Sequence, residues 1–277
     1  MNIKNGLKRR WNKWSRKINY QYRILTSRKR KLPEFIIIGT QKGGTTSLFA
    51  CLKQHPQIAM SRRKELHFFN TNFDKGLSWY RRFFPFKNSP LLAGEVTPCY
   101  LFHPEAAARM KVTIPDAKLI VMLRNPIDRA YSSYIMSVDF DWDDAPNFEA
   151  AIEQEKKLKE KESAIIAKNP SYFSIEKDHL FYLERSKYYE QLQVWLKHFK
   201  REQFLFLKSE DFFSHPQKEL TKVFDFLGVD AIYPSDLKAR NARQYDALSD
   251  GLREKLSLYF EEHNTNLANL LGENFEW

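Results

Sequence analysis

Residues 34–47 read Glu-Phe-Ile-Ile-Ile-Gly-Thr-Gln-Lys-Gly-Gly-Thr-Thr-Ser, and this stretch decides the fold. The apolar, largely β-branched run from Phe35 to Ile38 predicts a buried strand that ends at Gly39. A loop with lysine and glycine then leads into a predicted helix, whose N-terminus presents consecutive backbone N–H groups and is a ready anion site. The candidate phosphate-binding residues are Lys42, Gly43, Gly44, Thr45, Thr46 and Ser47.

The spacing within this loop differs from that of nucleotide triphosphatases, which read G-x-x-x-x-G-K-[ST]. Gly39 and Gly44 keep the two glycines of that frame, but Thr45 stands where the lysine should be. Lys42 instead lies two residues before Gly44, in the middle of the loop. The displaced lysine favours a phosphate ligand that is bound without a metal ion. A tight turn with no ligand is the alternative.

A second strand-to-helix unit lies at residues 118–134. The apolar run 118–123 predicts a buried strand, which is followed by Arg124 and by a helix that Pro126 helps to start. The fork-shaped guanidinium of an arginine suits a phosphate monoester. Arg124 is therefore a second candidate anion ligand, with a surface ion pair as the alternative for this residue taken alone.

Together the two units resemble those of sulfotransferases that use 3′-phosphoadenosine 5′-phosphosulfate (PAPS). Within that family the chain most resembles the heparan sulfate glucosaminyl 3-O-sulfotransferase branch, over residues 33–277. The supporting segments are Lys64–Phe69, Gly76–Tyr80, Gly94–Tyr100 and Leu271–Trp277. The resemblance implies a three-layer α/β fold, with a mostly parallel, P-loop-like central sheet flanked by helices. It also implies PAPS as donor, adenosine 3′,5′-bisphosphate as product and no metal.

The resemblance assigns roles to individual residues. Glu65 matches the catalytic base with His67 beside it, and Arg124 with Ser132 matches the pair that holds the 3′-phosphate. The chemistry is consistent, because sulfuryl transfer needs a carboxylate to remove the acceptor proton and a cation beside the leaving oxygen. Lys42 fits the second role. From the residues alone, Glu65 would be a solvated charge and His67 a structural histidine.

The chain departs from the branch at several positions. Asn70 stands where the branch has an acidic residue, and Val96 stands where it has a lysine. Both changes put the 3-hydroxyl of glucosamine in heparan sulfate in doubt as the acceptor. Of the family's late Lys-Gly-Arg cofactor loop only Arg243 carries over, and the cysteine pair near that loop is missing.

The length of 277 residues and the 43% apolar content predict one α/β domain, residues 32–277, with an appendage. Cys51 and Cys99 are too few for a disulfide framework, and we expect Cys51 to be a small buried hydrophobe. This cysteine usage predicts a reducing compartment, the cytoplasm. No run reaches about 18 apolar residues, so we expect no membrane-spanning helix; nor does the N-terminus resemble a signal peptide.

The net charge of +11 belongs to an N-terminal tail. Residues 1–31 hold 12 lysines or arginines and no acid, which leaves 33 basic against 34 acidic residues in the body. Apolar residues of the tail recur at steps of three or four and form one stripe of a predicted amphipathic helix: Leu7, Trp11, Trp14, Ile18, Tyr22 and Leu25. Such a helix favours an anionic membrane surface. The alternatives are docking on the protein's own body or a basic arm, and we do not expect nucleic acid as partner.

The remaining chain predicts short elements. We expect strands near residues 56–60 and 204–207, and helices at 148–168, 186–199, 220–227 and 252–260. Residues 148–168, with the acidic run 139–144 before them, are interpreted as a helical excursion over the acceptor site.

The predicted function is transfer of the sulfuryl group of PAPS to a hydroxyl of a carbohydrate or glycolipid, in the cytoplasm with a peripheral membrane contact. A P-loop-type small-molecule kinase is one alternative, and magnesium independence of turnover separates the two. A catalytically inactive basic tethering protein that binds membrane or nucleic acid is the other, and it would bind phosphate polymers in a steeply salt-dependent way. An amine acceptor also stays open.

Overall fold

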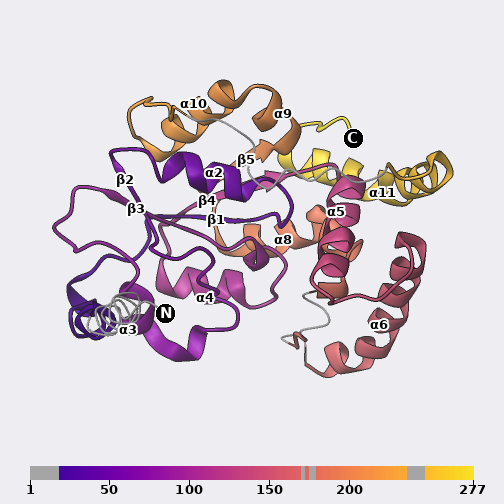
Figure 1. The fold of residues 1–277 in the computed structure, drawn as a ribbon, viewed down its shortest axis with the longest axis horizontal. Helices are drawn as coiled ribbons and strands as arrows, with labels where there is room; N and C mark the ends of the chain where they lie inside the picture. Colours follow the sequence, from indigo (N-terminus) through magenta and orange to yellow (C-terminus); the bar gives the residue numbers. More distant parts are fainter. Residues whose placement is uncertain (1–18, 170–171, 175–178, 236–246) are drawn as a thin grey trace, which may run out of the picture.

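Five parallel strands form the centre of the molecule, which a computed structural model describes for residues 19–169, 172–174, 179–235 and 247–277. The strands are β1 (Phe35–Gly39), β2 (Ile58–Met60), β3 (Leu92–Val96), β4 (Lys118–Leu123) and β5 (Phe204–Lys208). They lie in the order β2-β3-β1-β4-β5, so β1 is central and the predicted strand near residues 56–60 is an edge (Figure 1). The predicted α/β class and parallel sheet are confirmed.

The central position of β1 explains its composition. Phe35 and Ile37 pack into the core on one face of the sheet, and Ile36 and Ile38 pack into the core on the other face. All four side chains are fully buried. A strand covered on both faces carries a continuous apolar run instead of an alternating one, which is the pattern of the sequence.

Helices cover both faces of the sheet (Figure 1). One face is covered by α2 (Thr45–Leu52), α9 (Ser209–Ser214) and α10 (Pro216–Leu227). The other face carries α3 (Gly76–Arg81), α4 (Ala106–Thr113) and α8 (Tyr188–His198). The described residues also form short 3₁₀ turns: η1 (Ser27–Lys29), η2 (Phe73–Lys75), η3 (Pro98–Tyr100), η4 (Glu184–Ser186) and η5 (Arg201–Gln203).

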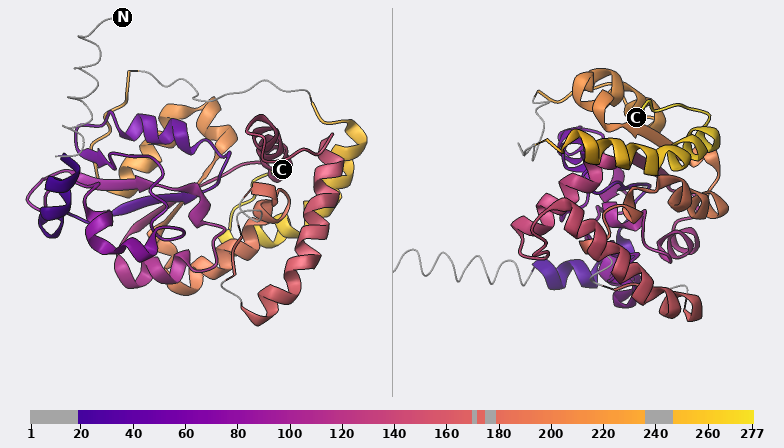
Figure 2. Two further views of the ribbon diagram at one scale, coloured as in Figure 1. Left: turned by 60° about the horizontal axis from the view of Figure 1, so that its bottom comes forward. Right: turned by 90° about the vertical axis from the view of Figure 1, so that its right-hand side faces the viewer.

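Three helices form a third packing unit at the side of the sheet where β4 ends (Figure 2). They are α5 (Pro126–Asp139), α6 (Phe148–Lys168) and α11 (Asp250–Leu271). Their shared core includes Tyr134, Phe148 and Phe260. The predicted helix 148–168 has the bounds of α6. The helix predicted at 252–260 was too short, because the buried stripe continues through Leu267 to Leu271 before Gly272 ends α11 in the left-handed conformation.

The described part of the tail is helical over residues 19–25. Leu7, Trp11, Trp14 and Ile18 of the predicted stripe lie outside the described residues. The two described members, Tyr22 and Leu25, are 53% and 83% exposed, so this part of the stripe does not dock on the body. Cys51 is buried, as predicted, and Cys99 is buried too. Within the described chain, no helix combines the length and the apolar character that crossing a bilayer requires.

Candidate active site

The predicted phosphate loop connects β1 to α2 at the carboxyl edge of the sheet. Gly44 adopts a φ of 90° and forms the N-cap of α2. A Cβ atom on Gly43 would lie 2.6 Å from the Met122 carbonyl oxygen, so only glycine fits there. Lys42 also has a positive φ, 70°, which is uncommon outside glycine and is found preferentially at functional sites.

Two neighbouring elements hold this loop in place. Ser209, the first residue of α9, donates its hydroxyl to the Gly43 carbonyl over 2.5 Å. Arg124, at the end of β4, donates Nη1 to the Lys42 carbonyl over 3.2 Å. The structure therefore brings Lys42 and Arg124 together, although 82 residues separate them in the sequence.

The three hydroxyl residues of the loop differ in exposure. Thr45 and Ser47 are buried, and Thr46 is half-buried at the N-terminus of α2. The hydroxyl oxygen of Thr46 accepts a hydrogen bond from Lys64 Nζ at 2.5 Å. Thr46 thus faces the segment that carries the predicted base.

The junction after β4 is built as the sequence predicts. Pro126 is the first residue of α5, and the Asn125 side chain caps that helix by accepting from the Ile127 and Asp128 backbone N–H groups at 3.0 and 3.3 Å. Arg124 is half-buried, and its carbonyl accepts from the Tyr188 hydroxyl. Ser132 lies on α5 and is buried.

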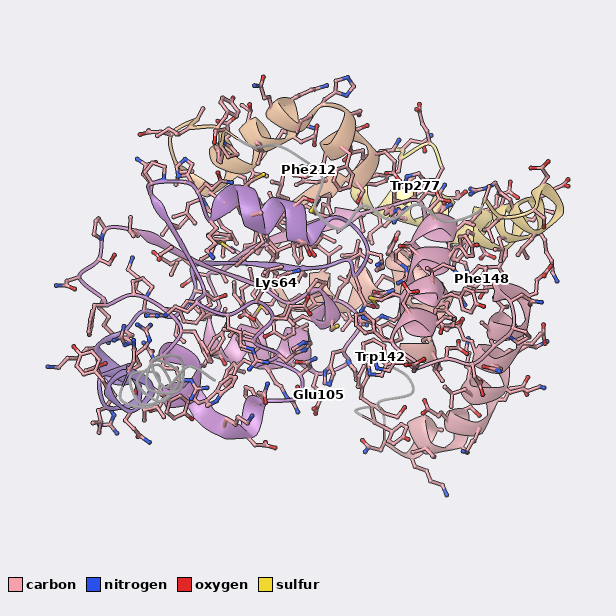
Figure 3. The ribbon with its side chains drawn as sticks, in the orientation of Figure 1. Lys64, Glu105, Trp142, Phe148, Phe212 and Trp277 are labelled. Carbon is pink, nitrogen blue, oxygen red and sulfur yellow. The ribbon has the colours of Figure 1, made fainter. Side chains whose placement is uncertain are left out.

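The predicted base lies on the loop after β2 and follows Lys64 in the sequence, which Figure 3 labels near the middle of the molecule. Glu65 Oε2 is 3.4 Å from His67 Nε2, and Glu65 Oε1 is 3.5 Å from Lys64 Nζ. A single ammonium group, that of Lys64, therefore links the Glu65 carboxylate to the Thr46 hydroxyl of the phosphate loop.

These contacts decide the charge of the carboxylate. Burial alone would raise the pKa of Glu65, but the hydrogen bond from His67 and the charge of Lys64 outweigh it and hold the pKa below its ordinary value. Glu65 is therefore ionised at neutral pH and can accept a proton. About a third of its side chain is exposed, so an acceptor can reach it.

The fully buried carboxylate of Glu95 supports the loop that carries Glu65 through hydroxyl groups that contact both. It accepts hydrogen bonds from the hydroxyls of Tyr80, Thr97 and Tyr100. Burial raises the pKa of Glu95, although these three bonds act in the opposite direction. The Thr97 and Tyr100 hydroxyl oxygens in turn accept from backbone N–H groups of the base-bearing loop: Leu66 at 3.1 Å, His67 at 3.4 Å and Phe68 at 2.7 Å.

The two positions where the chain departs from the heparan sulfate branch have different surroundings. Asn70 is buried, and its Nδ2 lies 3.2 Å from His67 Nδ1, so it touches the candidate site. Val96 is fully buried and belongs to the core that α2 covers. Arg243 lies outside the described residues.

Sequence reasoning missed Lys64, Glu95 and Thr97. Lys64 follows two arginines and has the pattern of a solvated charge, whereas Glu95 and Thr97 were noted only as part of a supporting segment. A charged residue inside an otherwise apolar strand was the available signal for Glu95, because an acid is seldom fully buried without hydrogen-bond partners.

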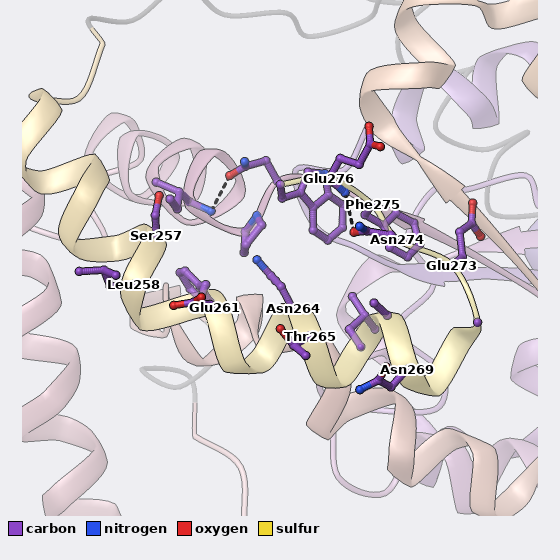
Figure 4. A pocket seen from close by; sticks show the side chains of 18 residues that line it. Ser257, Leu258, Glu261, Asn264, Thr265, Asn269, Glu273, Asn274, Phe275 and Glu276 are labelled. Carbon is purple, nitrogen blue, oxygen red and sulfur yellow. Dashed lines mark hydrogen bonds between the residues drawn. The ribbon is translucent and has the colours of Figure 1, made fainter.

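A large cavity lies beside this site instead of within it. Its volume is about 910 Å³, and its walls are the second half of α11, residues 272–277 and residues 125–127 at the start of α5 (Figure 4). None of the predicted site residues is among the described residues that line it.

Comparison with known proteins identifies the family. The sulfotransferase domain model matches residues 32–262. The chain belongs to the sulfotransferase family. This result confirms the resemblance first seen in the phosphate loop and in the Arg124 segment.

Individual sulfotransferases show how far the similarity extends. A Dictyostelium discoideum protein named membrane-associated sulfotransferase kil1 is 31% identical over 94% of this chain and 72% of its own length. The human heparan sulfate glucosamine 3-O-sulfotransferase 3A1 is 35% identical over 76% of this chain, which spans 47% of that relative. A crystal structure of a sulfotransferase from Alicyclobacillus acidocaldarius superposes with a TM-score of 0.71 at 28% identity, over 88% of this chain and 98% of the other.

Proposed function

We propose that this sulfotransferase moves the sulfuryl group of PAPS to a hydroxyl group of a carbohydrate or glycolipid and releases adenosine 3′,5′-bisphosphate. The observation that carries the proposal is the Lys64 ammonium group, which contacts both Thr46 of the phosphate loop and the Glu65 carboxylate. A donor bound at the phosphate loop and an acceptor beside Glu65 would therefore meet within one site.

The proposed reaction assigns one task to each group. Glu65 removes the proton of the acceptor hydroxyl as the acceptor oxygen bonds to sulfur, and the bond from sulfur to the bridging oxygen of the 5′-phosphate breaks. The proton stays on Glu65, and the leaving phosphate takes the electron pair. Lys42 and the N–H groups at the start of α2 stabilise the charge on that phosphate. His67 orients Glu65 through its contact of 3.4 Å.

The donor is held at its other end by the predicted 3′-phosphate ligands Arg124 and Ser132, with Arg243 as a further proposed contact. Arg124 is already joined to the loop through the Lys42 carbonyl. Binding of one bisphosphate across these two elements would therefore span β1 and β4, which are neighbours in the sheet. No metal ion is required in this scheme.

The acceptor class follows from the relatives and from two residues of this chain. Several relatives are named for heparan sulfate glucosamine, which supports a carbohydrate acceptor. Asn70 beside His67 and the buried Val96 replace one acidic and one basic residue of that branch, so we propose an acceptor other than its glucosamine 3-hydroxyl, either a different saccharide or a glycolipid.

We place the enzyme in the cytoplasm with a peripheral membrane contact through residues 1–31. A chain with two cysteines, both of them buried, agrees with a reducing compartment. The name of the Dictyostelium relative includes membrane association.

Calorimetric titration without metal tests the donor assignment. Adenosine 3′,5′-bisphosphate should bind the native protein, and Lys42→Ala and Arg124→Ala should each abolish the binding. Lys53→Ala, an exposed lysine at the end of α2, is the matched control and should bind normally. Binding of ATP with magnesium, and not of the bisphosphate, would instead indicate a kinase.

Turnover separates an enzyme from an inactive tethering protein. Glu65→Gln should bind the bisphosphate normally but fail to sulfate a panel of neutral oligosaccharides and glycolipids that the native protein modifies. Bisphosphate binding without transfer to any acceptor by the native protein would favour the inactive alternative.

A further inference from the structure

The helix at residues 19–25 is attached to the body through Arg23 and Tyr20. Arg23 donates Nη2 to the Phe84 carbonyl over 2.8 Å and Nε to the Arg82 carbonyl. The Arg82 guanidinium lies 4.2 Å from the centre of the Tyr20 ring. These contacts fix which side of the helix faces the protein.

The opposite side of this helix presents apolar groups to solvent. Leu25 is 83% exposed and Tyr22 is 53% exposed. On α3, which packs against η1 directly after this helix, Leu77 is also 44% exposed. Exposed apolar side chains beside cations are the combination that suits a membrane interface.

A cationic cavity lies directly after this helix. Its volume is about 580 Å³, and the described residues that line it are Arg28, Lys29, Phe86, Lys87 and Asn88. Main-chain pairing builds it, because the Lys87 N–H donates to the Lys29 carbonyl over 2.8 Å and Arg30 pairs with Phe86 in an antiparallel bridge. The Arg30 guanidinium stacks 4.1 Å above the Phe86 ring and supports the cavity wall.

The charge of this cavity is of one sign. Three of the five described lining residues are cations and none is an acid. Glu34 is the acid that follows Arg28 and Lys29 most closely in the sequence, and it is paired with Lys31 over 3.1 Å. Its charge is therefore not spent on the cations of the cavity. The volume is within the range of small-ligand sites.

We propose that this cavity binds the anionic headgroup of a phospholipid while Tyr22 and Leu25 enter the membrane interface beside it. The cations attract the headgroup phosphate, and the Asn88 amide can donate to its oxygens. Leu25 and Tyr22 gain from burial at the boundary between headgroups and acyl chains. This site is separate from Lys42, Glu65 and Arg124, so it does not depend on the proposed sulfuryl transfer.

The combination of groups favours a lipid surface over a soluble polyanion. A polyanion such as a nucleic acid or a sulfated glycan would use the cations but would gain nothing from an exposed leucine. A bilayer with anionic lipid offers both partners, since its surface potential attracts the cations and its interface accepts the apolar groups.

Sedimentation with vesicles tests the proposal on the full chain. The protein should bind vesicles of phosphatidylcholine with phosphatidylserine, and bind phosphatidylcholine alone much less. The triple variant Arg28→Gln, Lys29→Gln, Lys87→Gln should bind the anionic vesicles roughly a hundredfold more weakly, the factor expected for three cations near such a surface. Leu25→Ala should weaken binding severalfold.

Matched variants on other elements supply the controls. Lys156→Gln, Lys157→Gln, Lys161→Gln removes the same charge from exposed positions of α6, and Leu258→Ala truncates a leucine that is 68% exposed on α11. Both should bind vesicles like the native protein. All variants should retain affinity for adenosine 3′,5′-bisphosphate, or for ATP should that be the ligand, which shows that they are folded.

Two results would overturn the proposal. If the triple variant at Arg28, Lys29 and Lys87 and the control triple variant on α6 lost vesicle affinity equally, only the net charge of the protein would matter for binding. Tight binding of a single-stranded oligonucleotide that depends on Arg28, Lys29 and Lys87 but not on Leu25, together with no binding to vesicles, would identify a nucleic-acid site.

Discussion

Thr97 connects the buried Glu95 carboxyl to the loop that carries Glu65, and Thr97→Val tests that connection. Valine has nearly the shape of threonine, so the exchange removes the hydroxyl and little else. Thr97 is fully buried. Its hydroxyl donates to Glu95 Oε1 over 2.7 Å and accepts from the Leu66 N–H at 3.1 Å and the His67 N–H at 3.4 Å.

The magnitude follows from the groups left without partners. A buried N–H that loses its acceptor costs about 1–3 kcal/mol, and this applies fully to Leu66. The bond to the His67 N–H is longer and only partly buried, so it contributes less. Glu95 Oε1 keeps the Tyr100 hydroxyl at 2.8 Å. The free energy of unfolding should therefore fall by about 2–4 kcal/mol.

The effect on activity should be larger than the effect on donor binding. Leu66 and His67 directly follow the predicted base Glu65, and a displacement of about 1 Å at a reacting group can lower the rate by about a hundredfold. We expect kcat to fall by about 10- to 100-fold, while the affinity for adenosine 3′,5′-bisphosphate is unchanged, because the phosphate loop is held separately by Ser209 and Arg124.

Urea unfolding, steady-state kinetics and calorimetry measure these three quantities. Thr113→Val is the control, because the Thr113 hydroxyl donates only to the Arg109 carbonyl of its own helix, and it should cost less than about 0.5 kcal/mol. A Thr97→Val protein with native stability and native kcat would refute the reasoning. Lower stability with native kcat would show that the hydroxyl supports the fold but does not position Glu65.

Three further predictions concern charge and space. Because the pKa of Glu65 is held below its ordinary value, activity should stay level as the pH falls from neutrality and decline only below the usual carboxyl range; a pH–rate profile that declines between about pH 7 and pH 6 would contradict this assignment. Burial raises the pKa of Glu155 to about 7. Between pH 7 and the ordinary pKa of 4.5, the folded protein therefore holds a proton on this carboxyl group that the unfolded chain has released. Glu155 should therefore raise the free energy of unfolding by about 3 kcal/mol as the pH falls through that window, and urea melts at its two ends should show that Glu155→Gln loses this contribution. Gly43→Ala places a Cβ 2.6 Å from the Met122 carbonyl oxygen, which is backbone and cannot turn away, so bisphosphate affinity should fall by about tenfold or more in calorimetry. Gly251→Ala, with open space around its Cβ, should bind normally.

Local patterns in the sequence determined β1, β4, β5 and the short edge strand β2, the phosphate loop and the end of β4, whereas β3 was not predicted as a strand. The run Phe35–Ile38 is apolar at every position because both of its faces are covered, and that is visible without any partner. Gly43 and Gly44 signal close approach and a left-handed turn, and Pro126 signals the start of α5. These features depend on residues that are adjacent in the sequence, so they can be predicted from the sequence alone. The bounds of α11 could not be predicted, because its second half is mostly polar and only the packed structure shows that Leu267 and Leu271 are buried.

The tertiary structure alone decided how the candidate site is joined together. In the sequence Lys64 is the last of three consecutive bases, and only the fold carries its ammonium group to Thr46, 18 residues away. Glu95 is likewise a charge within a strand until Tyr80, Thr97 and Tyr100 surround it. Leu25 points outward because Arg23 of the same helix donates hydrogen bonds to the carbonyls of residues 82 and 84, and this fixes how the helix is turned. Such contacts join segments far apart in the chain, and their energy depends on distances that only the packed molecule sets.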